Sequence, residues 1–212
     1  MRMEHLISGF NSLEHFEPTA TCLQKFFCFR LEEFYRVCDW FEVRCDDENN
    51  VESVSWAKRT PLHDFQGGSI RLSWIPPNVA EFDIRWQGLS GSISTESLSH
   101  SLVTLLLGGN RFHGTIDLCT LPPKLELFSI PGNEIEGPID LTSLPSGLAT
   151  LNLHKNKIYQ EIVDLSYIPE STTRILLTRN SIGKLVDADG DVETHECVKI
   201  DPPRESIFSG YL

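Results

Sequence analysis

The sequence of 212 residues has room for one domain, and its 40% hydrophobic and 23% charged residues are ordinary for a soluble globular protein. Its formal net charge of −12 argues against nucleic-acid binding through a generally basic surface. No apolar run approaches the ~20 residues of a membrane-spanning helix. The first residues contain no apolar stretch typical of a signal peptide, which favours a cytoplasmic or intracellular protein, or an extracellular one if a leader was removed.

Two helices are predicted near the N-terminus, one over roughly residues 3–15 and one that begins near Thr19 or Thr21. The second carries an apolar stripe made of Leu23, Phe26, Phe27, Phe34 and Val37. We interpret residues 1–50 as a helical N-terminal cap, because the end of a repeat array exposes an apolar face that needs cover.

The segment 38–45 reads CDWFEVRC and is the most specific short motif in the chain. It resembles the C-x-W-x-G-V-x-C box that ends the N-terminal cap of plant-type leucine-rich repeat proteins and their protist relatives, with Glu42 in place of the usual glycine. In that family the two cysteines pair, so the resemblance implies a Cys38–Cys45 disulfide. The lack of a recognisable leader favours reduced thiols instead, since cytosolic thiols stay reduced.

Six repeat units follow over residues 51–182. The three clearest have a period of 23 and share the pattern L-x-x-L-x-L-x-x-N, which resembles the leucine-rich repeat signature. The resemblance implies a β-rich solenoid of the α/β class, in which six repeats form a short right-handed arc of parallel strands. Two units are irregular: the first has an insertion around residues 59–63, and the fifth has one extra residue between Ile158 and Leu165.

One asparagine ends the pattern in each of four repeats: Asn110, Asn133, Asn156 and Asn180. Each repeat turns sharply after its strand, and a buried carboxamide offers donors and an acceptor to the backbone groups that the turn leaves unpaired. We therefore predict that these four residues form a structural ladder. In the second repeat Gln87 occupies the same position.

The second half of the repeats carries the phrase G-x-I-D-L, at residues 114–118 and 137–141. It resembles the G-x-I-P segment of plant-specific repeats, which forms a second short strand there. Prolines follow in the phrases at 121–125 and 144–148, and proline disfavours a long helix. We expect an extended or 3₁₀ convex side.

Residues 183–212 are predicted to form a C-terminal cap or tail, because the repeat pattern fades after Asn180. Residues 187–191 read DADGD, but glycine and the final acidic residue do not fall at the positions that an EF-hand calcium loop requires. An acidic turn is the favoured interpretation.

Motifs for catalysis are absent from the sequence: it has no G-x-S-x-G, no phosphate-binding loop and no H-E-x-x-H. The six cysteines form no C-x-x-C pair and the seven histidines do not cluster at metal spacing. We therefore predict no enzyme activity, no metal site, no cofactor and no small-molecule substrate.

The residues between the strand leucines should point out from the concave face, because side chains alternate along a strand. Five of these residues are basic and two are acidic, which gives this face a net charge of +3 on an acidic protein. Such a face suits a partner with an acidic surface. The predicted partner-binding residues, which add an apolar strip to the basic groups, are Lys58, Arg85, Trp86, Leu106, Leu127, Lys155, Arg174, Leu176 and Arg179.

The leading hypothesis is a non-catalytic protein–protein interaction module, or a scaffold subunit of a complex, that binds a protein partner on the concave face. One alternative is a secreted or cell-surface recognition protein that binds a ligand or glycan through the same face. A further alternative is a binder of RNA or another polyanion, which would show a steep dependence on salt.

Overall fold

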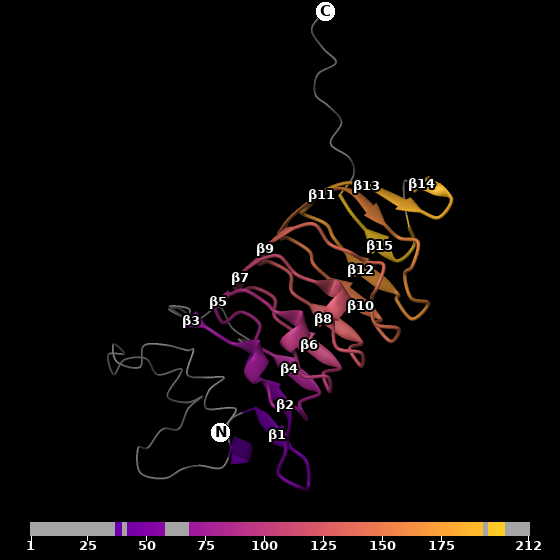
Figure 1. Ribbon diagram of the computed structural model, residues 1–212. Coiled ribbons are helices and arrows are strands. Elements are labelled where there is room, and N and C mark those ends of the chain that lie inside the picture. The colour runs from indigo at the N-terminus through magenta and orange to yellow at the C-terminus, as the bar shows by residue number, and fades with distance from the viewer. Residues whose placement is uncertain (1–36, 40–41, 58–67, 193–194, 202–212) are drawn as a thin grey trace, which may run out of the picture.

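The computed structural model describes residues 37–39, 42–57, 68–192 and 195–201, and the described chain winds into a solenoid (Figure 1). Each full turn contributes one strand to each of two sheets. The predicted β-rich solenoid of six repeats is confirmed. The two N-terminal helices, the insertion at 59–63 and the partner-binding candidate Lys58 lie outside the described residues.

The first sheet has eight strands and carries the predicted concave face. In spatial order they are β1 (Val43–Cys45), β2 (Val51–Ser55), β4 (Glu81–Asp83), β6 (Thr104–Leu106), β8 (Leu127–Ser129), β10 (Thr150–Asn152), β12 (Arg174–Leu176) and β15 (Val198–Lys199). Only β1 is antiparallel to its neighbour; the other pairs are parallel. The register places equivalent residues of successive repeats side by side, as in Phe82, Leu105 and Phe128.

The second sheet, which we call the outer sheet, has seven strands. In spatial order they are β14 (Gly190–Val192), β13 (Ser181–Asp187), β11 (Lys157–Asp164), β9 (Glu134–Gly137), β7 (Arg111–Gly114), β5 (Leu89–Gly91) and β3 (Gly68–Ser69). A second strand per repeat was predicted, but the G-x-I phrase does not form it. Instead β7 and β9 end at Gly114 and Gly137, whose φ angles of 83° and 77° turn the chain out of the sheet.

The predicted 3₁₀ or extended convex side is confirmed for the described part of the chain. Its short helices are η3 (Leu72–Trp74), η4 (Thr95–Ser97) and η5 (Leu118–Thr120), and η2 (Val37–Asp39) precedes β1. The aspartate of the I-D-L phrase caps the N-terminus of η5, where the Asp117 side chain accepts a hydrogen bond of 2.9 Å from the Cys119 N–H. Asp140 and Asp164 accept equivalent bonds of 2.8 Å in the next two turns.

The core lies between the two sheets and consists of the pattern's apolar residues. Phe82, Leu105, Phe128, Leu151 and Ile175 form one fully buried row, one residue per turn. Truncating a buried phenylalanine to alanine typically costs about 3–5 kcal/mol. This row therefore fixes the strands on which the concave face is built.

Two features depart from a regular repeat. In β11, Gln160 accommodates the extra residue of the fifth repeat: its side chain accepts a hydrogen bond of 2.8 Å from the Ile139 N–H, just beyond β9, and donates one of 2.7 Å to the Ile162 carbonyl. At the C-terminal end, β15 pairs with β12, with Val198 opposite Ile175. The first sheet thus continues beyond the six predicted repeats, into the segment predicted as a cap or tail.

Candidate binding surface

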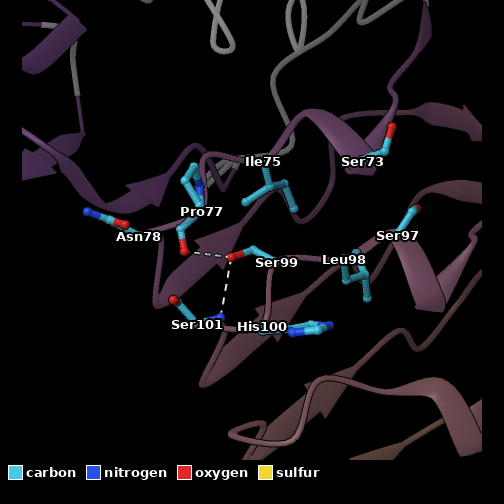
Figure 2. A pocket seen from close by; sticks show the side chains of 9 residues that line it. All are labelled: Ser73, Ile75, Pro77, Asn78, Ser97, Leu98, Ser99, His100 and Ser101. Atoms are coloured by element: carbon cyan, nitrogen blue, oxygen red, sulfur yellow. Dashed lines mark hydrogen bonds between the residues drawn. The ribbon is translucent and has the colours of Figure 1, made fainter.

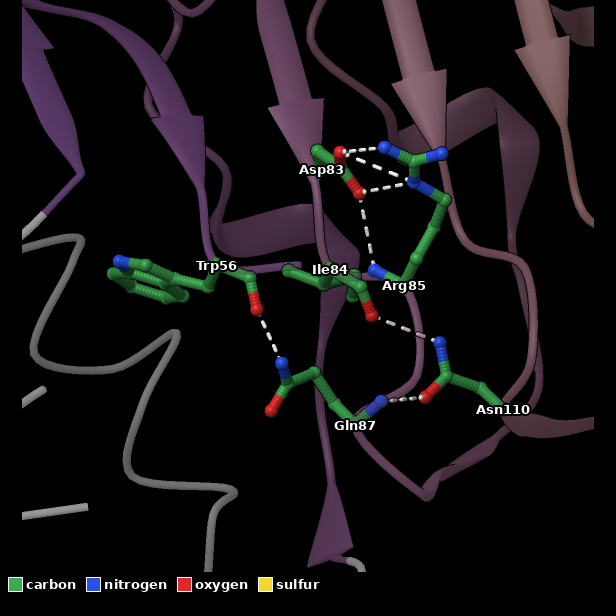
Figure 3. A network of polar contacts seen from close by, with 6 residues as sticks. All are labelled: Trp56, Asp83, Ile84, Arg85, Gln87 and Asn110. Atoms are coloured by element: carbon green, nitrogen blue, oxygen red, sulfur yellow. Dashed lines mark hydrogen bonds and ion pairs between the residues drawn. The ribbon is translucent and has the colours of Figure 1, made fainter. Parts of the chain in front are cut away.

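The asparagine side chains fix the turns that follow the strands of the concave face. Asn110 accepts hydrogen bonds from the N–H groups of Gln87 (3.0 Å) and Leu89 (3.1 Å). Its Nδ2 donates to the carbonyls of Ile84 (3.0 Å) and Leu107 (2.9 Å), one in each adjoining turn. Figure 3 shows the two Asn110 bonds that involve the Gln87 N–H and the Ile84 carbonyl, together with the bond that Gln87 Nε2 donates to the Trp56 carbonyl.

The other three asparagines repeat the same geometry. Each Nδ2 donates to the carbonyls at the ends of two successive strands, and each Oδ1 accepts one N–H of the preceding turn. For Asn133 the carbonyls belong to Leu107 and Ile130, for Asn156 to Ile130 and Leu153, and for Asn180 to Leu153 and Leu177. These bonds hold neighbouring turns in register, which is a structural role.

The residue before each asparagine or Gln87 has a left-handed backbone. This row, which we call the φ-positive row, contains Trp86 (62°), Gly109 (69°), Gly132 (64°), Lys155 (56°) and Arg179 (59°). From Trp86 to Lys155, each N–H in the row donates to a carbonyl of the next turn, over 2.8–2.9 Å. The Arg179 N–H donates instead to the carboxylate of Asp201, over 2.5 Å. The row therefore continues the ladder of the sheet and presents its side chains at the rim of the concave face.

Trp86 is the one large hydrophobic residue of the predicted partner-binding set that is strongly exposed, at 61%. Its indole lies against the next residue of the row: a Cβ placed on Gly109 would be 2.1 Å from Trp86 Cε3. One face of the ring is thus seated on the backbone while the other stays open to solvent.

Charge on the concave face is divided between its two ends, which sequence reasoning did not predict. At the N-terminal end Arg85 forms a two-pronged ion pair with Asp83, with Nε–Oδ1 at 2.9 Å and Nη2–Oδ2 at 2.7 Å (Figure 3). The hydrogen bonds that Arg85 donates to the Asp83 carboxylate also raise the pKa of Arg85. Arg44 pairs with Glu81 over 3.0 Å. These four charges cancel, so Arg85 adds no net charge to the face.

The C-terminal end of the face is basic. Lys155, Arg174, Arg179 and Lys199 are all exposed there, and none forms an ion pair with another described residue. We call these four residues the basic end. Sequence reasoning missed Lys199, although it and its neighbours Val198 and Ile200 lie 23 residues after Leu176, Ile175 and Leu177.

The predicted apolar strip is less continuous than expected. Leu106, Leu127 and Leu176 are half-buried on the concave face, and polar residues occupy the paired positions on the neighbouring strands. The register places Leu106 beside Ser129, and it separates Leu176 from that pair by Asn152. Trp86 therefore stands apart as the exposed anchor, because the leucines are spread over several turns.

The structure joins Cys38 and Cys45 by a disulfide with an S–S distance of 2.07 Å. This bridge ties η2 to β1 at the edge of the first sheet. The remaining described cysteines are free: Cys119 is exposed, and Cys197 is buried with its Sγ 3.3 Å from Nδ1 of His195. Partial desolvation and the nearby Asp140 carboxylate raise the pKa of the Cys119 thiol, and burial raises the pKa of the Cys197 thiol.

A hollow of about 610 Å³ lies where the chain enters β4 and β6 (Figure 2). Serines and His100 line it, but Ser99 Oγ is already engaged by the backbone, donating to the Pro77 carbonyl (2.9 Å) and accepting from the Ser101 N–H (3.3 Å). We assign it no ligand. In the described residues no three His, Cys, Asp or Glu side chains are grouped to hold a metal ion. The same residues contain no helix that is long and apolar enough to cross a lipid bilayer.

Comparison with known proteins finds likeness in structure only. No family model and no curated protein matches the sequence. A chain of the BIR3–SERK2 complex from Arabidopsis thaliana matches with a TM-score of 0.58 at 20% identity, over 87% of this chain and 93% of that one. Pollen Receptor Kinase 3 matches with a TM-score of 0.58 at 18% identity, over 79% and 80% of the two chains.

A plant ice-binding protein also matches, with a TM-score of 0.52 at 21% identity. The match covers 69% of this chain and 48% of that protein, so this chain spans about half of its length. The fold is a leucine-rich repeat solenoid. At these identities the likeness establishes the fold alone, and this fold serves both receptor and ice-binding proteins.

Proposed function

We propose that this chain is a non-catalytic binding module that engages a protein partner on its concave face. The observation that carries the proposal is the basic end: four exposed cationic side chains stand on adjacent turns of a fixed scaffold, on a protein whose net charge is −12. Their charge attracts an acidic protein surface and steers its approach.

Trp86 provides the second contact. Tryptophan and arginine are the residues most enriched where binding energy concentrates in interfaces. The indole is held on Gly109 before any partner arrives, so little conformational entropy would be lost when a partner covers it. Trp86 and the basic end lie on opposite ends of one face, which suits a partner that crosses several turns.

The comparisons support a protein partner by analogy. The chain that matches 87% of this one belongs to a complex of two proteins, BIR3 and SERK2. Solenoids present an extended surface to their partners, and the same use is proposed for this chain.

The disulfide favours one alternative from the sequence, a secreted or cell-surface recognition protein. Disulfides persist in oxidising compartments and are rare in the cytosol. This alternative concerns where the protein works, and it keeps the same concave face as the binding site. We therefore favour an extracellular location over the cytoplasmic one expected from the sequence.

The experiment is affinity capture from the protein's own cells with the wild type and two charge-reversal variants. Lys155→Glu with Arg174→Glu changes the basic end, and Arg71→Glu with Lys124→Glu makes the same charge change at exposed residues outside the concave face. We expect the captured protein partner to fall by about tenfold with the first variant only. Equal capture by both variants would contradict the proposal.

The polyanion alternative is tested with the same proteins. Binding of a single-stranded RNA would have to fall steeply with salt, because each neutralised phosphate releases counterions. The polyanion alternative would be excluded if the chain still captures a protein partner while its RNA binding is weak and does not change with salt.

A further inference from the structure

The outer sheet carries an exposed apolar surface that the proposed function does not use. Tyr159 is 73% exposed and Ile162 is 46% exposed, and both lie on β11, the longest strand in the described residues. Tyr167, on the same turn of the solenoid, is 70% exposed. Three of the four exposed large hydrophobic side chains in the described part of the chain therefore belong to one repeat. We call Tyr159, Ile162 and their charged neighbours on β9, β11 and β13 the outer patch.

The extra residue of the fifth repeat produces this exposure. Ile158 and Val163 both point into the core, five residues apart, so strict alternation fails between them. Ile162 is turned outward, as strand alternation requires of the residue directly before the inward-facing Val163. The two hydrogen bonds of Gln160 hold this irregular part of β11 in place.

The neighbouring strand leaves the patch uncovered. The β11–β13 register sets Gly183 beside Glu161, and a Cβ on Gly183 would be only 2.4 Å from the Glu161 carbonyl oxygen. A side chain at residue 183 is thus excluded by the backbone of β11. Tyr159 and Ile162 lie before and after Glu161 in β11, and residue 183 has no side chain that could cover them.

The rim of the outer patch is acidic. Its exposed or half-exposed charged groups on the three strands are Glu134, Glu136, Lys157, Glu161, Asp164, Lys184 and Asp187, five acidic and two basic, for a net charge of −3. Lys157 is already paired with Glu134 over 2.7 Å. Glu136 lies opposite Lys157 in the β9–β11 register, which leaves negative charge in excess around the apolar groups.

We propose that the outer patch is a second interface, for a protein segment that presents an apolar side chain flanked by lysine or arginine. The apolar centre supplies contact area and the acidic rim selects a basic partner. A second copy of this chain is disfavoured as the occupant, because a two-fold contact would bring two acidic rims together. The concave face and the outer patch lie on different sheets, so the two partners need not compete (Figure 1). The two partners would also differ in charge, because one surface is basic and the other acidic.

The test is selection of binding peptides from a displayed library of short random sequences on the immobilised full chain. Peptides that bind a Tyr159→Ser, Ile162→Ser variant are removed first. We expect the recovered peptides to carry an apolar residue flanked by lysine or arginine, and their affinity for that variant to be about tenfold or more below that for the wild type. Recovery of acidic or uncharged peptides, or of none that depends on Tyr159 and Ile162, would overturn the proposal.

Two further variants separate the possible failures. Glu136→Lys with Glu161→Lys should abolish the selection for basic peptides while leaving the melting temperature within the range of the wild type. Lys155→Glu with Arg174→Glu, which tests the proposed function, should leave these peptides bound. Sedimentation of the wild type checks self-association: a dimer that dissociates in the Tyr159→Ser, Ile162→Ser variant would identify a second copy as the occupant and overturn the proposal.

Discussion

The indole of Trp86 rests on Gly109, so closely that a Cβ on Gly109 would lie 2.1 Å from Trp86 Cε3. The two residues are consecutive members of the φ-positive row, and each is joined to the next turn by a backbone hydrogen bond. The orientation of the most exposed aromatic side chain on the concave face thus depends on a glycine in the following repeat.

Gly109→Ala should displace the indole and destabilise the fold. The φ of 69° alone disfavours alanine by about 1–2 kcal/mol, and the new methyl group occupies space that the ring now fills. Urea unfolding measures the stability, and tryptophan emission compared with a Trp86→Phe background reports the ring. Gly147→Ala is the control, because nothing lies within 4 Å of a Cβ there. If Gly109→Ala has the same urea stability and tryptophan emission as this control, the indole of Trp86 does not pack against Gly109.

Asn133→Ala should destabilise the protein by about 1–3 kcal/mol, since it leaves the Phe112 N–H and the carbonyls of Leu107 and Ile130 without their side-chain partner. Asn133→Asp should cost at least as much, because a carboxylate keeps the acceptor but faces two carbonyl oxygens. Thermal unfolding measures both variants. The exposed Asn78 provides the control, as Asn78→Ala removes a carboxamide that lines only the hollow.

Stability should decrease in acid through Asp140 and Asp164, which occupy equivalent positions in successive turns. Hydrogen bonds from Thr142 and Ser166 hold the pKa values of Asp140 and Asp164 below their ordinary value of 3.8. A carboxyl group whose pKa is lower in the folded state contributes stability that is present above its unfolded pKa and is lost as the pH falls through the folded pKa. The loss should therefore occur below about pH 4.

The double variant Asp140→Asn, Asp164→Asn tests this dependence. Asparagine can still accept the two backbone hydrogen bonds but does not ionise, so stability near neutral pH should change little while the acid slope becomes shallower. Urea midpoints across the acid range provide the comparison. A slope identical to that of the wild type would show that these two carboxylates do not contribute to it.

Loss of the Cys38–Cys45 bridge should lower stability by about 2–3 kcal/mol on the chain-entropy model, given the sequence separation of 7. Cys45→Ser should lower the melting temperature, and a reducing agent should lower that of the wild type by a similar amount. Cys119→Ser is the control, because Cys119 is a free exposed cysteine. A wild-type protein that melts at the same temperature with and without reductant would contradict the expected contribution.

The pattern of Leu105, Leu107 and Asn110, repeated after 23 residues, was enough to predict the solenoid because each of these residues has the same environment in every turn. It also predicts which residues point outward, since strand alternation is local. The outward exposure of Ile162 could not be predicted in this way. The extra residue of its repeat is visible in the sequence, but its location in β11 depends on the contact of Gln160 with Ile139 and on the pairing with β13.

Pairing between charged residues also limited the prediction of the site. Asp83 and Arg85 are two residues apart, so the alternation that places both on the concave face also brings them together, and that signal was available. The pairing of Arg44 with Glu81 joins β1 to β4 across the sheet, and only the three-dimensional register reveals it. The seating of Trp86 on Gly109 likewise requires a left-handed tryptophan, which the sequence does not favour.

The central claim is that a protein partner occupies the concave face, and site-specific photo-crosslinking in the protein's own cells tests it most directly. A photoreactive residue replaces Thr150, which lies between Leu127 and Arg174 in the first sheet, and in a matched protein it replaces the exposed Lys124 outside that face. We expect residue 150 to crosslink to one partner, and Lys155→Glu with Arg174→Glu to remove that crosslink. Crosslinks from residue 124 alone, or a crosslink from residue 150 that survives the charge reversal, would contradict the account.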